Sequence, residues 1–200
     1  MSALSTKARI LAAAQILMQQ RGTQAVSFRH ISDAVGVCKA TVVHHFSNKE
    51  KLVEAVLAHH RHRLLERLDK ITTTQLSASD QLMLVLEIFR GSTGQGPLLQ
   101  PCLSGILGAE PESVSIGALT IVQEFCESVE ERLSDILRQG WDEGTFDFPG
   151  SVNETAALVF AFLVGSAMYA RGDNGHQRWV DVSKQLMTML GANRPCVAAC

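Results

Sequence analysis

Residues 26–46, VSFRHISDAVGVCKATVVHHF, combine residue types and spacings that suit contact with DNA. The second half of the segment would turn Val42 and Phe46 inward, because residues four apart lie on one face of a helix. The residues left on its outer face are small, hydroxyl-bearing or basic: Lys39, Ala40, Thr41, Val43 and His44. Small residues permit close approach to base edges and basic ones contact phosphates, so the segment predicts a surface for a major groove.

Two short helices joined by a tight turn would position this surface. The first carries Phe28, Ile31 and Val35 at helical spacing, which predicts one apolar stripe. Ser27 precedes it and can cap the free backbone N–H groups at its start. Gly36 follows it and lets the chain reverse where a Cβ atom would be costly. The pattern is typical of a helix-turn-helix.

The longer run from Thr6 to about Leu57 resembles the DNA-binding domain of the tetracycline-repressor-like (TetR) family. The matching sequence is ILAAAQILMQQRGTQAVSFRHISDAVGVCKATVVHHFSNKEKLVEAVL, and its HHFSNKEKL end is the most family-like piece. Two positions depart from the family pattern. Cys38 stands where a small hydroxyl residue is usual, and Val43 stands where an aromatic residue is common.

Position and resemblance together predict the DNA contacts. Ala40 and Thr41 are expected to contact base edges, with the Thr41 methyl suited to a thymine methyl. Lys49 lies in the first turn of the next helix, where Ser47 and Glu50 predict a capping box and where backbone N–H groups can also hold a phosphate. The full predicted set is Ser27, Arg29, Lys39, Ala40, Thr41, Val43, His44 and Lys49.

Charge is unevenly distributed along the 200 residues. Residues 1–70 hold 11 Lys and Arg against 5 Asp and Glu, whereas residues 71–200 hold 7 against 15. Six of the seven histidines also lie in the first seventy residues. A basic N-terminal part joined to an acidic C-terminal part is expected if only the first contacts phosphates.

The sequence predicts an all-α protein of about nine helices, with a three-helix helix-turn-helix domain followed by a helical effector-binding and dimerisation domain. The domain boundaries are expected at 1–48 and 49–193, with helix 49–71 linking the two and 194–200 as a flexible tail. Helices are expected at about 5–20, 28–35, 39–46, 49–71, 79–90, 98–109, 112–140, 152–171 and 176–190.

The resemblance implies a cytoplasmic homodimer that binds a palindromic operator in double-stranded DNA. Helices 112–140 and 152–171 would form a four-helix interface with those of the partner. Ala157, Ala161 and Gly165 form a ridge of small residues that permits close helix approach. The apolar run 156–170 is short of the roughly 20 residues that a membrane helix needs, so no membrane contact is expected.

The resemblance also implies an effector pocket enclosed by the helices between residues 49 and 140. Candidate lining residues are chosen by their position on the inward face of a predicted helix and by side-chain size. They are His60, Leu64, Phe89, Cys102, Leu103, Ile106 and Phe125. They are mainly apolar, which suggests a small hydrophobic or amphipathic effector. His60 fits either a ligand contact or a core histidine with a hydrogen-bond partner, because a buried imidazole needs one.

The predicted function is a sequence-specific transcriptional regulator, a repressor that its effector releases from the operator. Two alternatives remain: a redox- or electrophile-sensing regulator acting through Cys102, or a DNA-binding protein without an effector. No catalytic motif is present, so an enzyme is not expected. No cofactor is expected, and no metal either, because His59, His60 and His62 cannot all point at one ion from a straight helix.

Overall fold

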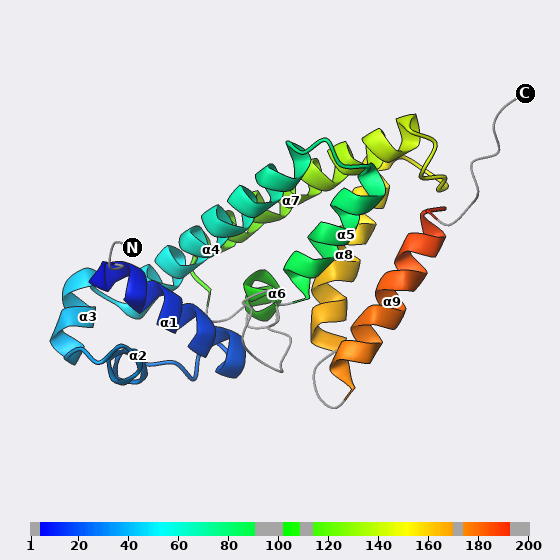
Figure 1. The fold of residues 1–200 in the computed structure, drawn as a ribbon. Coiled ribbons are helices and arrows are strands. Elements are labelled where there is room, and N and C mark those ends of the chain that lie inside the picture. Colours follow the sequence, from blue (N-terminus) through cyan, green and yellow to red (C-terminus); the bar gives the residue numbers. More distant parts are fainter. Residues whose placement is uncertain (1–4, 91–101, 109–113, 170–173, 193–200) are drawn as a thin grey trace, which may run out of the picture. The chain divides into compact units, whose positions relative to one another are not determined.

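The computed structural model describes residues 5–90, 102–108, 114–169 and 174–192 (Figure 1). All regular structure in these ranges is helical, which confirms the predicted all-α class. The helices are α1 (Thr6–Arg21), α2 (Phe28–Val35), α3 (Lys39–His45), α4 (Lys49–Thr72), α5 (Ala78–Phe89), α6 (Leu103–Gly108), α7 (Ile116–Asp142), α8 (Val152–Tyr169) and α9 (Gly175–Met189). The starts predicted at 98 and 112 and the end predicted at 171 fall outside the described residues.

Contacts divide the chain into two compact units. Unit 1 comprises residues 1–64 and 102–125, and unit 2 comprises residues 65–101 and 126–200. The division falls inside α4 and inside α7, because each of these long helices contributes its first part to unit 1 and its second part to unit 2. The predicted domain boundary at residue 48 therefore does not coincide with a boundary between the two compact units. It stays a prediction.

Unit 1 is built around one hydrophobic core to which α1–α4 and α6 contribute. Val42 and Phe46 are 0% and 3% exposed, so the inward anchoring predicted for the second helix of the helix-turn-helix is confirmed. Leu103 and Leu107 of α6 join the same core. The short α6, which comes from the middle of the chain, thus stabilises the N-terminal helices by burying apolar area against them.

The ends of the helices in unit 1 are set by specific residues. The Ser27 hydroxyl accepts a hydrogen bond from the His30 backbone N–H, and the His30 ring accepts one from the Ser27 N–H. Gly36 ends α2 in the left-handed conformation at φ +73°. The Lys51 N–H at the start of α4 donates to Asn48 Oδ1 over 2.8 Å. Asn48 therefore caps this helix, in place of the capping box predicted from Ser47 and Glu50.

Unit 2 contains α5, α8, α9 and the second parts of α4 and α7. The Phe89 and Phe160 rings meet edge to face, with centroids 6.2 Å apart. Gly140 of α7 lies against the Phe146 ring, and a Cβ atom there would come within 2.0 Å of it. The glycine is therefore required by the close approach of this aromatic ring. α8 contacts both α5 and α9.

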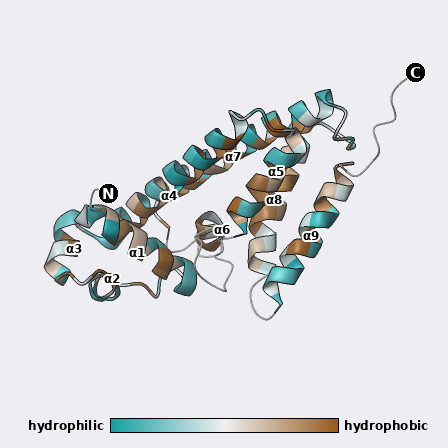
Figure 2. Cartoon of the chain, viewed as in Figure 1, coloured by the Kyte–Doolittle hydropathy of each residue, from teal (hydrophilic) through white to brown (hydrophobic). Residues whose placement is uncertain are grey.

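α8 is hydrophobic along most of its length (Figure 2). By length and composition alone it is long and apolar enough to cross a membrane, as core helices of soluble proteins also are. One face packs inside unit 2 through residues such as Val159 and Leu163, both 0% exposed. A second face is solvent-exposed and still apolar, and it contains Leu158, Ala161, Gly165, Met168 and Tyr169.

Candidate nucleic-acid interface

α3 presents the surface that its sequence predicts. Its only fully buried side chain is Val42, and Phe46 follows as the second anchor. Lys39, Ala40 and His44 are exposed, and Val43 is 42% exposed. α3 packs on α2, which packs on α1, so three helices hold this outer face in a fixed orientation within unit 1.

Cys38 and Thr41 are joined at the start of α3. Cys38 is the N-cap residue, but its side chain makes no capping hydrogen bond. Instead its Sγ atom lies 3.1 Å from Thr41 Oγ1. This hydrogen bond, with backbone N–H groups of the first turn, lowers the pKa of the Cys38 thiol below its usual value. The Thr41 hydroxyl predicted to face base edges thus already has a partner on its own helix.

The remaining predicted DNA contacts lie at the ends of α2 and α4. Arg29 is exposed and faces Asp33, with Nε 3.9 Å from Oδ2, so its guanidinium keeps most of its donors available. Lys49 Nζ donates to the Gln24 carbonyl over 2.9 Å. An ammonium has three N–H donors, so this contact leaves two for a phosphate. Ser27 is exposed, and its hydroxyl accepts the capping bond from His30.

Within unit 1, His60 is the most unusual of the predicted pocket residues. Its Nδ1 lies 3.1 Å from Gln15 Nε2, whereas its buried Nε2 has no hydrogen-bond partner. The ring lies beside Phe125, with centroids 5.8 Å apart. Burial, assisted by the charge of Arg63 and by His59, lowers the pKa of His60 to about 4. The imidazole is therefore neutral at neutral pH.

The low pKa of His60 makes a pH-dependent contribution to stability. In the unfolded chain the imidazole binds a proton below its ordinary pKa of 6.5. In the folded protein the same imidazole stays neutral down to about pH 4. The contribution of His60 to stability is therefore fully present above pH 6.5, and it decreases as the pH falls. Between pH 6.5 and 5 we expect the free energy of unfolding to drop by about 1.5 kcal/mol from this group. Urea unfolding of His60→Leu should lack this component.

The matched control for that measurement is His62→Leu, which removes an exposed histidine from the same helix. This variant should retain the pH-dependent component that is assigned to His60. Equal pH profiles for wild type and His60→Leu would show that the buried imidazole does not contribute.

The other predicted pocket residues do not form one lining within a single unit. Leu103 is 0% exposed within the core of unit 1, whereas Phe89 packs on Phe160 in unit 2. Leu64, Ile106 and Phe125 are buried side chains of unit 1. The pocket set therefore stays a prediction.

Cys102 is buried in unit 1, where its Sγ atom lies 2.9 Å from Ser104 Oγ. Burial raises the pKa of its thiol. Because the thiolate is the reactive form, this environment disfavours reaction with an electrophile.

Two features were missed by sequence reasoning. His30 completes the capping box of α2, but Glu or Gln is the residue sought at that position. A groove between α5 and α9 is lined by residues about 100 positions apart in the chain, and no local pattern indicates it. Within the described residues, no three His, Cys, Asp or Glu side chains gather closely enough to hold a metal ion.

The chain is similar to known regulatory proteins. Residues 10–56 match the model of a family described as bacterial regulatory proteins, tetR family. The nucleoid occlusion factor SlmA of Vibrio cholerae is 24% identical over 184 residues, which cover 88% of this chain and 92% of SlmA. The HTH-type transcriptional repressor KstR2 of Mycolicibacterium smegmatis is 32% identical over 78 residues, which cover 39% of this chain and 38% of KstR2.

The fold is similar to that of a solved structure, a transcriptional regulator of the TetR family from Agrobacterium tumefaciens. The two superpose with a TM-score of 0.83 at 20% identity, covering 92% of this chain and 96% of the other. The match over residues 10–56 includes α2, α3 and the exposed face described above.

Proposed function

Because the chain is a transcriptional regulator of the tetR family, we propose that it represses by binding a palindromic operator as a cytoplasmic homodimer, and that a small apolar effector releases it. The exposed face of α3 is the observation that carries the DNA-binding part. Lys39 and His44 supply basic groups there, Ala40 and Thr41 supply small and methyl-bearing surface, and buried Val42 fixes their direction. Members of this family are typically DNA-binding proteins without enzymatic activity.

A selection from genomic DNA fragments at near-physiological salt tests specific recognition. The purified protein is expected to recover a palindromic site, and a Lys39→Ala, Thr41→Ala double variant is expected to lose it. Recovery of diffuse, salt-sensitive fragments without a common site would contradict sequence-specific binding. In that case the positions that depart from the family pattern, Cys38 and Val43, would be examined first.

The exposed apolar face of α8 supports the homodimer. Leu158 is 62% exposed, and Gly165 has open space where a Cβ atom would lie. With Ala161 between them, these residues form a stripe on which a second helix can approach closely. Large exposed apolar surfaces rimmed by polar residues mark interaction sites in soluble proteins.

α7 is predicted to share this interface, and its two faces differ. Val129, Leu133 and Ile136 are at most 1% exposed, so this stripe packs inside the protomer. Most of the exposed residues in its second half are charged, among them Glu127, Glu131, Asp135 and Arg138, and Trp141 is exposed near its end. We therefore propose that α8 supplies the apolar centre of the dimer and that the second half of α7 contributes a mainly charged rim.

An effector response is consistent with the family, in which small-molecule effectors are frequent. Thermal unfolding in the presence of a small-molecule set tests for one, because any ligand that binds the folded state raises the melting temperature. A protein without an effector would show no shift with any compound. The burial and raised pKa of Cys102 give no support to a redox alternative.

A further inference from the structure

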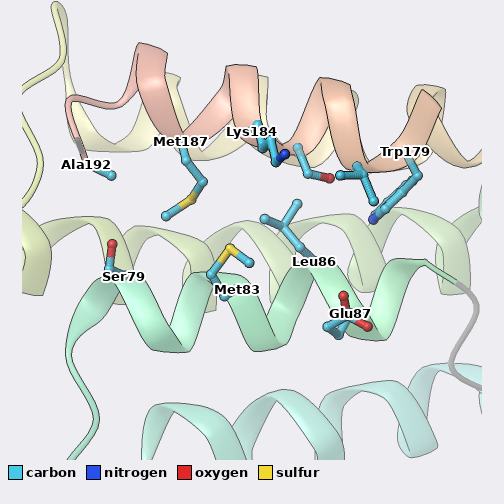
Figure 3. Close-up of a pocket in the computed structure, with 10 residues that line it drawn as sticks. Ser79, Met83, Leu86, Glu87, Trp179, Lys184, Met187 and Ala192 are labelled. Atoms are coloured by element: carbon cyan, nitrogen blue, oxygen red, sulfur yellow. The ribbon is translucent and has the colours of Figure 1, made fainter. Parts of the chain in front are cut away.

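Unit 2 contains a groove between α5 and α9 with a volume of about 350 Å³ (Figure 3). None of the residues predicted to line an effector pocket borders it. Its walls are mainly apolar, with Met83 and Leu86 on α5 and Trp179 and Met187 on α9. The volume is at the lower end of the range for ligand pockets, about 300–1,000 Å³, and suits a small molecule.

Ser183 is the most deeply buried polar residue in the wall of this groove. It lines the wall, it is only 8% exposed, and its Oγ atom has no hydrogen-bond partner. A buried hydroxyl without a partner costs about 1–3 kcal/mol, and native structures rarely retain one without a reason. A ligand with a polar head group in the groove would supply the missing hydrogen bond.

The charges beside the groove favour an anionic head group. Glu87 lines the α5 side, but its carboxylate is paired with Arg90 over 2.6 Å. Lys184 lines the α9 side next to Ser183, and within the described ranges its ammonium has no carboxylate partner. The unbalanced charge at the groove is therefore positive, and it is adjacent to the hydroxyl that lacks a partner.

We propose that the α5–α9 groove binds a small apolar molecule that ends in a carboxylate, such as a saturated monocarboxylic acid. The apolar chain lies on Met83, Leu86 and Trp179. The carboxylate accepts hydrogen bonds from Ser183 Oγ and Lys184 Nζ. This site and ligand class deepen the proposed function, and any effect of the ligand on operator binding rests on that function.

Trp179 provides a direct reporter, because the chain has only two tryptophans and the other can be replaced. Trp141 is 48% exposed and meets the Phe148 ring edge to face. In a Trp141→Phe background, titration with decanoate is expected to change Trp179 emission, and a brominated decanoate is expected to quench it by contact.

Lys184→Met in the same background tests the head group. It removes the ammonium from an exposed position and keeps most of the apolar stem. We expect decanoate affinity to fall about tenfold, the range for one lost hydrogen bond to a charged group, while 1-decanol affinity stays unchanged. Ser183→Ala is expected to weaken both ligands without lowering the melting temperature of the free protein, because the lost hydroxyl makes no bond there.

The matched control is Lys70→Met, which removes the same charge from an exposed position on α4 in unit 2. It should leave decanoate affinity unchanged. Absence of quenching at millimolar brominated decanoate would overturn the proposal, and so would equal effects of Lys184→Met and Lys70→Met. Operator release is measured separately, so binding without release would contradict the effector role while leaving the site established.

Discussion

Replacing Leu158 by glutamate is expected to convert the protein to a monomer and to weaken operator binding by more than about 100-fold, because two linked half-site contacts become one. Leu158 is 62% exposed on the apolar face of α8. In a two-fold interface each substitution appears twice, so two carboxylates would be buried in the same apolar interface. Burying unpaired charges of the same sign costs far more than the lost apolar contact.

Sedimentation or light scattering at micromolar concentration would measure the change in mass, and anisotropy of labelled operator would measure affinity. The control is Leu84→Glu, which places the same charge on an apolar α5 residue that is 42% exposed and outside α8. A Leu158→Glu variant that remains dimeric would exclude the α8 face as the interface. Retained helical content would show that the chain still folds.

The second large effect is expected at the start of α3. Lys39→Glu should weaken binding to all DNA sequences alike, on the order of 100-fold at ~150 mM salt in the dimer, because each protomer loses a phosphate contact and gains a repulsive charge. The slope of log affinity against log salt should become shallower for the same reason. Lys39 is exposed, so stability should change little.

Lys70→Glu is the matched control, because it makes the same charge change at an exposed residue at the end of α4, in unit 2. Fluorescence anisotropy across a series of salt concentrations would compare the two variants. If both weakened binding equally, net charge rather than a contact at Lys39 would explain the loss.

Much of the fold was predictable because its signals are local. The spacing of Val42 and Phe46 fixed which side of α3 turns inward, and the exposed face followed from it. Gly36 marked the turn because its φ of +73° is costly for other residues. Helix ends were less certain, since Ser47, Asn48 and neighbouring polar residues compete for the same cap, and the structure uses Asn48.

The site in the C-terminal part was less predictable because periodicity shows that a residue faces inward without showing what covers it. Leu103 faces inward as expected, but it packs into the core of unit 1 with the N-terminal helices. The α5–α9 groove joins Met83 to Trp179, and their proximity depends on tertiary packing. That the Ser183 hydroxyl lacks a hydrogen-bond partner likewise depends on tertiary packing and has no signal in the sequence.

The contact between Cys38 Sγ and Thr41 Oγ1 also has an entropic consequence. Ordering a side chain during association costs about 0.5–1.5 kcal/mol for a flexible residue. Thr41 is β-branched and already has a hydrogen-bond partner one turn away, so its rotamer is set before DNA arrives. Cys38 stands where a hydroxyl residue is usual, and its side chain does not cap α3. It instead preorganises the Thr41 side chain on the exposed face of this helix.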